Sequence, residues 1–207
     1  MKSRRLLLCF CCLLFFLPLA AQRTVFGVGL AVGTSWEIDH FSRQIPEAGV
    51  DGGFGYGIKA IIGYELGNFQ FALRPQLLRQ NTRAFIIPKD DVPNGADERI
   101  YRTAILLPVR VDYRFGRQRF RPLLGVGGGF LLDAARDPMA RLRPEPILPF
   151  IEVAVGVEWR TGKLAWRPEV TVRNGTGELF ALGGGPFNSL LIGQRWAFVS
   201  FGLVVTK

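Results

Sequence analysis

Few side chains in this sequence could carry out acid–base chemistry. The single histidine, His40, lies in a predicted loop, with Asp39, Ser35 and Ser42 close to it in sequence. A histidine beside a serine and an acid is a combination that can remove or transfer an acyl group. Neighbours on one flexible loop are not held in a fixed arrangement, however, and we favour a solvated loop. We therefore predict no catalytic residue and no enzymatic activity.

Metal and cofactor sites have equally little support. The acidic stretch 89–98 offers oxygen ligands of the kind that Ca²⁺ binds, but it lacks the spacing of a calcium loop. The glycines of 125–129 are followed by no helical pattern, so they do not predict a phosphate-binding loop. The charge of +6 carried by residues 22–207 is spread along the predicted strands and forms no patch for nucleic acid. We expect no cofactor, no metal, no nucleic-acid partner and no identifiable small-molecule substrate.

The other charged residues alternate with apolar ones. Between 100 and 115, Arg110 and Asp112 share one parity, while Val109 and Val111 share the other. Such alternation predicts a strand with one polar and one apolar face, and no amphipathic helical pattern of useful length competes with it. The pattern predicts an all-β fold with eight strands, at about 25–35, 53–66, 69–80, 99–115, 119–133, 147–160, 164–174 and 190–205.

The connections between these strands are alternately short and long. The short ones, 67–68, 116–118 and 161–163, each contain a glycine, which a tight hairpin needs where φ is positive. The long ones lie near 36–52, 81–98, 134–146 and 175–189. An even strand number with short turns at one end predicts an antiparallel up-and-down transmembrane β-barrel, its termini in the periplasm. A soluble barrel or sandwich would alternate too, but the small residues on the polar parity favour a crowded barrel interior.

Parity assigns the charged side chains to the lumen. Because eight strands enclose a space that side chains just fill, and buried charges persist when paired, we predict an ion-paired core rather than an anion-favouring pore. The predicted lumen network is Lys59, Glu65, Arg74, Arg102, Arg110, Asp112, Arg114, Arg121, Glu152, Glu158, Arg160, Arg167, Glu169 and Arg173.

Aromatic residues of the apolar parity predict two girdles at the membrane interfaces. The girdle at the short-turn end comprises Tyr64, Phe69, Tyr113, Phe115, Phe120, Trp159 and Trp166, and the second group comprises Phe54, Tyr56, Tyr101 and Phe130. Membrane lipid is therefore an expected partner.

The N-terminus has the layout of a cleaved signal peptide, residues 1–21, which leaves a barrel domain at 22–207. Residues 1–5 are basic, 6–19 are almost entirely apolar, and Ala20 and Ala21 are small. The apolar run is shorter than a spanning helix requires, and none of its cysteines follows the small residue of a lipoprotein signal. Cleavage removes three basic residues and all three cysteines, leaving a charge of +6 and no disulfides. The predicted location is the bacterial outer membrane.

Several stretches of the sequence resemble one family of small barrels. The most specific of them is FIEVAVGV at 150–157 with KLAWRPE at 163–169, and the others are 26–30, 69–77, 107–109 with 121–127, and the end of the chain at 188–201. Together they resemble PorT, a family of small outer-membrane barrels of Bacteroidota that type IX secretion requires. The resemblance implies export of proteases, adhesins or gliding proteins together with other secretion-system proteins, and it implies no active site. A generic structural or adhesive barrel of the OmpX or OmpA kind is the alternative, followed by a small pore and an acyl-chain enzyme.

Overall fold

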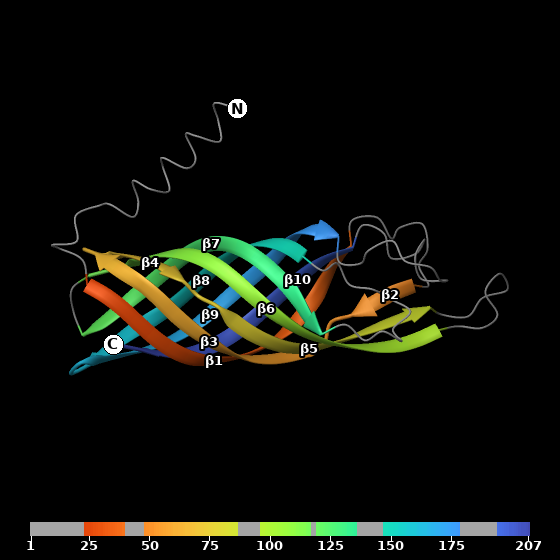
Figure 1. Ribbon diagram of the computed structural model, residues 1–207, viewed down its shortest axis with the longest axis horizontal. Coiled ribbons are helices and arrows are strands. Elements are labelled where there is room, and N and C mark those ends of the chain that lie inside the picture. Colours follow the sequence, from red (N-terminus) through yellow and green to blue (C-terminus); the bar gives the residue numbers. More distant parts are fainter. Residues whose placement is uncertain (1–22, 40–47, 87–95, 117–118, 136–146, 179–193) are drawn as a thin grey trace, which may run out of the picture.

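The computed structural model describes residues 23–39, 48–86, 96–116, 119–135, 147–178 and 194–207, which form one antiparallel sheet closed into a barrel (Figure 1). Its strands are β1 (Arg23–Asp39), β2 (Ala48–Asp51), β3 (Phe54–Leu66), β4 (Phe69–Leu73), β5 (Gln76–Ile86), β6 (Ala96–Arg114), β7 (Phe120–Ala135), β8 (Ile147–Thr161), β9 (Leu164–Glu178) and β10 (Gln194–Thr206). Among the described residues, no helix is long and apolar enough to cross a membrane.

The ten strands make eight barrel strands, because β4 and β5 are two halves of one and β2 continues β3 along β5. The break falls at Arg74 and Pro75, where proline has no N–H to give to the ladder. Hydrogen bonds still hold the break to its neighbours: Ala60 N donates to Pro75 O, and Arg74 N donates to Pro108 O, both at 2.9 Å. Leu73 and Leu77 face outward on either side, so the alternation of faces continues across the break.

The eight-stranded antiparallel barrel predicted from the sequence is thereby confirmed. Each barrel strand pairs with its neighbours along the chain, and β1 pairs with β10 from Gly27↔Thr206 to Asp39↔Gln194, which closes the cylinder. The three short turns contain Gly67, Gly116 and Gly162, whose φ values are 60°, 78° and 60°. Figure 1 shows β1 beginning and β10 ending at the short-turn end.

The observed strands run beyond their predicted ends at the long-loop side. β1 continues to Asp39, β5 to Ile86 and β9 to Glu178, in segments predicted as loop. Strand β2 also lies in a predicted loop and pairs with β5, Val50 opposite Ala84. The alternation weakens in these polar extensions, but backbone hydrogen bonding between antiparallel neighbours does not require it.

The two parities of each strand face opposite sides of the wall. On β6, the side chains of Arg110 and Asp112 are each 1% exposed, whereas Val109 is 59% exposed. The same division holds along β3, β8 and β9, where exposed and buried positions alternate. The interior of this protein is therefore polar over much of its length, and its exterior is apolar.

Candidate functional site: the charged core of the barrel

The centre of the lumen is organised around one carboxylate, Glu169 of β9. Lys59 of β3 donates from Nζ to Glu169 Oε1 at 2.6 Å. Arg74, directly after β4, donates from Nη1 to Oε2 at 3.1 Å, and Arg110 of β6 donates from Nη2 to the same oxygen. All four side chains are at most 3% exposed. One anion thus holds cations from three other barrel strands.

A second acid, Asp112 of β6, extends this cluster. Arg110 donates from Nε to Asp112 Oδ1 at 2.7 Å, and Arg74 donates to Oδ2. The backbone of β7 passes close by at Gly125, where an added Cβ would lie against Asp112 Oδ1 and 3.0 Å from Arg110 Nε. The missing side chain leaves room for the ion pair. This position explains one of the glycines that the sequence places on the polar parity.

Glu152 of β8 links the cluster toward the long-loop end. It accepts a hydrogen bond from Arg173 Nε at 2.9 Å, and its other oxygen lies 3.9 Å from Arg110 Nη1. Arg173 in turn donates to Ser200 Oγ at 3.5 Å. The ion pairs are consequently continuous across β6, β8 and β9, and a hydrogen bond extends them to β10.

A second cluster fills the short-turn half of the lumen around Glu158 and Glu65. Glu158 pairs with four guanidinium groups, those of Arg114, Arg121, Arg160 and Arg167. Glu65 accepts hydrogen bonds from Arg114 and from Arg160, the latter at 3.3 Å. Each acid thus serves several cations: the five acidic residues of the predicted network lie within 4.0 Å of Lys59, Arg74, Arg110, Arg114, Arg121, Arg160, Arg167 and Arg173.

The structure places the fourteen side chains of the predicted network on the lumen side of the wall. Glu65 and Arg160 lie at the short-turn mouth and are partly exposed, at 13% and 35% of their side chains. Arg102 is buried on the long-loop side of the clusters. The other eleven are buried too.

Sequence reasoning missed an apolar layer that fills the lumen toward the long-loop end. The rings of Trp196 and Phe198 are stacked with centroids 5.8 Å apart, and Phe150 meets Trp196 edge-on at 6.0 Å. Trp196 Nε1 donates to Gln80 Oε1 at 3.2 Å, which satisfies the indole. Four fully buried leucines accompany the rings: Leu78, Leu106, Leu131 and Leu148. A signal existed for Phe150 and the four leucines, because they share the parity of the charged lumen residues on their strands.

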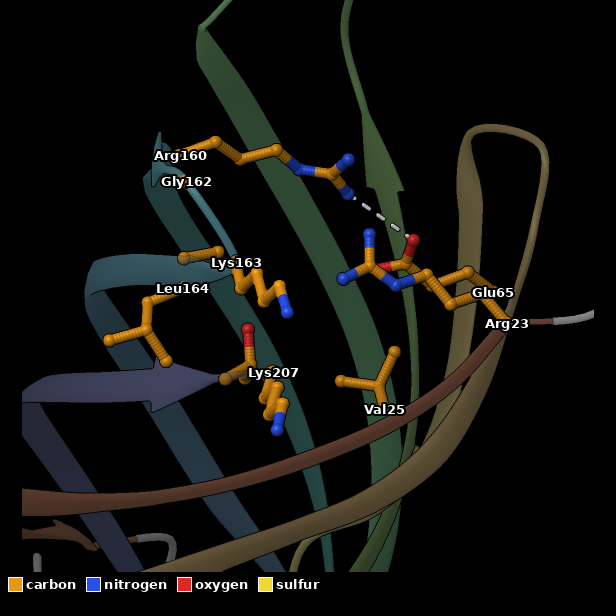
Figure 2. A pocket seen from close by; sticks show the side chains of 10 residues that line it. Arg23, Val25, Glu65, Arg160, Gly162, Lys163, Leu164 and Lys207 are labelled. Carbon is orange, nitrogen blue, oxygen red and sulfur yellow. Dashed lines mark hydrogen bonds and ion pairs between the residues drawn. The ribbon is translucent and has the colours of Figure 1, made fainter.

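The short-turn mouth forms a small pocket of about 40 Å³ (Figure 2). Figure 2 shows Arg23 and Arg160 approaching Glu65, with Lys163 and Lys207 on the opposite side. A space of this size holds about one water molecule or small ion. This pocket is therefore too small to hold an organic substrate.

The predicted aromatic girdle forms a chain of ring contacts on the outside of the short-turn end. Phe69 meets Tyr113 at 4.9 Å and Tyr113 meets Phe115 at 4.8 Å, while Phe120 stacks on Trp159 at 5.6 Å. Trp166 lies opposite Trp159 in the register, and Tyr64 stacks on Phe71. The second group, Phe54, Tyr56, Tyr101 and Phe130, is exposed on the outside toward the long-loop end.

Between the two aromatic groups, the outer wall is aliphatic. Val28 and Leu30 of β1, Ile58 of β3, Val126 of β7 and Val153 of β8 are all exposed. A soluble barrel would bury this face and expose its charges. An apolar band between aromatic girdles, around a polar interior, is the arrangement of a barrel that crosses a bilayer.

The remaining candidates fall partly outside the described residues. His40 and most of the acidic stretch 89–98 lie there, as do the side chains of Asp39 and the signal segment. In the part of the chain that the structure describes, no group of three or more His, Cys, Asp or Glu is placed to hold a metal ion.

No protein-family model and no curated protein matches the chain. Among solved structures, it is similar to Neisserial surface protein A, with 13% identity and a TM-score of 0.49 over 89% of this chain and 97% of that one. It is similar to the outer membrane enzyme PagL, with 10% identity and a TM-score of 0.44 over 87% and 97%. It is also similar to the N-terminal β-barrel domain of Pseudomonas aeruginosa OprF, with 12% identity and a TM-score of 0.41 over 90% of this chain and 99% of that one. The fold assignment rests on the closed ladder of this chain itself.

Proposed function

We propose that the protein is a β-barrel of the bacterial outer membrane that acts through its rim and loops, with a lumen closed to solutes. The observation that carries this proposal is the inverted polarity of the barrel, apolar outside and ion-paired inside. A closed barrel satisfies every backbone hydrogen bond within the wall, which a hydrocarbon environment demands. A signal peptide at residues 1–21, as the sequence predicts, would deliver the chain to the envelope.

Two layers across the lumen support the closed state. The Glu169 cluster reaches from β9 to β3, β4 and β6, so its side chains cross the interior from wall to wall. Trp196, Phe198 and Phe150 fill the next layer toward the long loops. Eight strands leave little more room than these side chains occupy. A conducting pore would need both layers to move aside.

Within this class, we favour an accessory role in type IX secretion, on the strength of the resemblance to PorT. The residues that carry the resemblance include Glu152 and Glu169, and both are central acceptors of the lumen network. The shared motif thus serves the stability of the barrel, and contact with other secretion-system proteins would fall to the rim and loops. A generic structural or adhesive barrel is the second candidate, because the same interior would suit it.

Location is tested by fractionation of the native host. The protein should be found in the outer-membrane fraction and should be extracted from it by detergent. It should migrate faster on gels before boiling than after it, as folded barrels do. Recovery from the soluble periplasm would contradict both candidates.

The secretion role is tested by deleting the gene and comparing the secreted proteins with those of the parent strain. Type IX cargo should accumulate in the periplasm, with unchanged permeability to small dyes. The wild-type gene should restore secretion. The matched control is an unrelated small outer-membrane barrel expressed at the same level, which should not. A normal set of secreted proteins in the deletion strain would contradict the secretion role and leave the generic structural or adhesive barrel as the candidate function.

A further inference from the structure

A groove of about 740 Å³ lies on the apolar outer wall, across β10, β1, β3, β5 and β6. Its lining includes Val28, Leu30, Ile58, Ala60, Leu77 and Ile105. The groove exists because two adjacent positions are small or ring-shaped, Ala60 and Pro75, which are joined by the hydrogen bond from Ala60 N to Pro75 O. Larger exposed side chains, Ile58 and Leu77, stand beside them. The strand break thus produces a depression in the band that faces lipid.

The register leads from this groove to a group of arginines on the same outer face. One step toward the long loops from Leu77 is Arg79, which lies between Tyr56 of β3 and Thr103 of β6. Four residues, or roughly 13 Å, further along, Arg83 lies directly opposite Arg99. All three arginines are exposed. We refer to Arg79, Arg83 and Arg99 as the outer basic patch.

The surroundings of Arg79 suit a headgroup rather than a protein acid. Its neighbours in the register are Tyr56 and Thr103, whereas Arg83, further along, lies opposite Asp51 of β2 as well as Arg99. Tyr56 and Tyr101 lie at the same levels, and tyrosine favours the interface between lipid and water. Guanidinium groups bind phosphate with two parallel hydrogen bonds. The wall therefore combines an apolar channel with phosphate-binding groups at one end of it.

We propose that the groove and the outer basic patch bind one anionic lipid with a phosphorylated headgroup. An acyl chain lies along Ala60 and Pro75, and the phosphate contacts Arg79 and Arg99. The lipid comes from the leaflet at the long-loop end, so the proposal rests on the membrane location proposed above. A second copy of the chain fits less well. Two copies inserted in the same direction would bring their basic patches to the same level, where like charges repel.

The test uses purified barrel in detergent, whose fold is checked by its heat-modifiable gel mobility, and native mass spectrometry of bound lipid. Phosphatidic acid should bind with a stoichiometry of one. Phosphatidylcholine with the same chains should bind at least about tenfold more weakly, because its headgroup has no net charge. Glycerol 3-phosphate, which has the phosphate without the chains, should not bind. Binding of glycerol 3-phosphate alone would show a free-phosphate site and overturn the lipid assignment.

Variants separate the two halves of the site. The double variant Arg79→Gln, Arg99→Gln should weaken the binding of phosphatidic acid at least about tenfold. Ala60→Phe, which fills the groove from the lipid side, should weaken this binding by a similar factor. Lys163→Gln, at the short-turn end, and Val126→Phe, on the outer face of β7, are the matched controls and should bind like the wild type. Unchanged binding by the arginine variant, or equal loss in Lys163→Gln, would overturn the proposal.

A groove variant that abolishes a dimer in the mass spectrum, without affecting lipid binding, would assign the groove to a second copy. The location experiment is independent of this one, because the mass measurement uses folded protein outside the cell. A protein found in the soluble periplasm would defeat the proposed function even if it bound lipid in detergent. A protein found in the membrane that binds no lipid would defeat only the inference.

Discussion

Replacing Glu169 with glutamine should be among the most destabilising single changes in the barrel. Glutamine keeps the volume and one acceptor oxygen but removes the negative charge that Lys59, Arg74 and Arg110 share. The Glu169 side chain is 1% exposed, so water cannot take over as the partner. Removing one member of a buried ion pair costs about 3–5 kcal/mol. We expect a loss of this size in the free energy of unfolding.

The assay is urea unfolding of the barrel refolded in lipid vesicles, followed by tryptophan fluorescence and by gel mobility. Glu65→Gln is the comparator, because its side chain is 13% exposed at the mouth and should show a smaller loss. The double variant Lys59→Met, Glu169→Gln removes a cation together with the anion. It should recover about 1–2 kcal/mol relative to the sum of the single variants, since neighbouring charges are coupled.

A loss below about 1 kcal/mol for Glu169→Gln would refute this reasoning. That value is typical of solvent-exposed ion pairs, and it would mean that water reaches the centre of the lumen. The closed-lumen part of the proposed function would then fail as well.

Three further perturbations test the rest of the structure. Val109→Arg, on the lipid face of β6, should destabilise the barrel by about 2–4 kcal/mol in the same assay. A cysteine at 109 should react with lipid-phase probes, and a cysteine at 110 should not. The reverse labelling would show that the lipid and lumen faces are assigned the wrong way round. Trp196→Ala should cost about 3–5 kcal/mol in urea unfolding, because it empties the apolar layer and leaves Gln80 without its indole donor; a change under about 1 kcal/mol would show that the layer is loosely packed. In planar bilayers the purified protein should carry no steady ion-selective current, and anion-favouring conductance that falls in Arg110→Gln would instead establish a pore.

Much of the barrel could be predicted from the sequence because a membrane wall imposes period two on every strand. The three hairpin turns could also be predicted, since Gly67, Gly116 and Gly162 occupy conformations that other residues rarely adopt. The position of Pro75 indicated a further feature, because proline inside a strand marks an interruption. Its effect, the split into β4 and β5, follows from that chemistry, but the predicted strand ran through it.

The contacts inside the lumen could not be predicted in the same way. Alternation states which face a residue occupies and leaves open which residues meet across the barrel. That Glu169 meets Lys59, Arg74 and Arg110 depends on the stagger of the strands, which no local pattern contains. The apolar layer was missed because β10 carries no charged residue on the parity of Trp196 and Phe198, so charge alternation did not assign that parity to the lumen.

The sequence separations within the Glu169 cluster have a kinetic consequence. Its partners Lys59, Arg74 and Arg110 lie 110, 95 and 59 residues away, so no hairpin formed early can contain these ion pairs. They come together only when β9 takes its place across the lumen from β3, β4 and β6. Interactions absent from the folding transition state act mainly on the unfolding rate. Glu169→Gln should therefore accelerate unfolding about a hundredfold or more, as a loss of about 3 kcal/mol or more in the barrier to unfolding implies, while the rate of insertion and folding changes little.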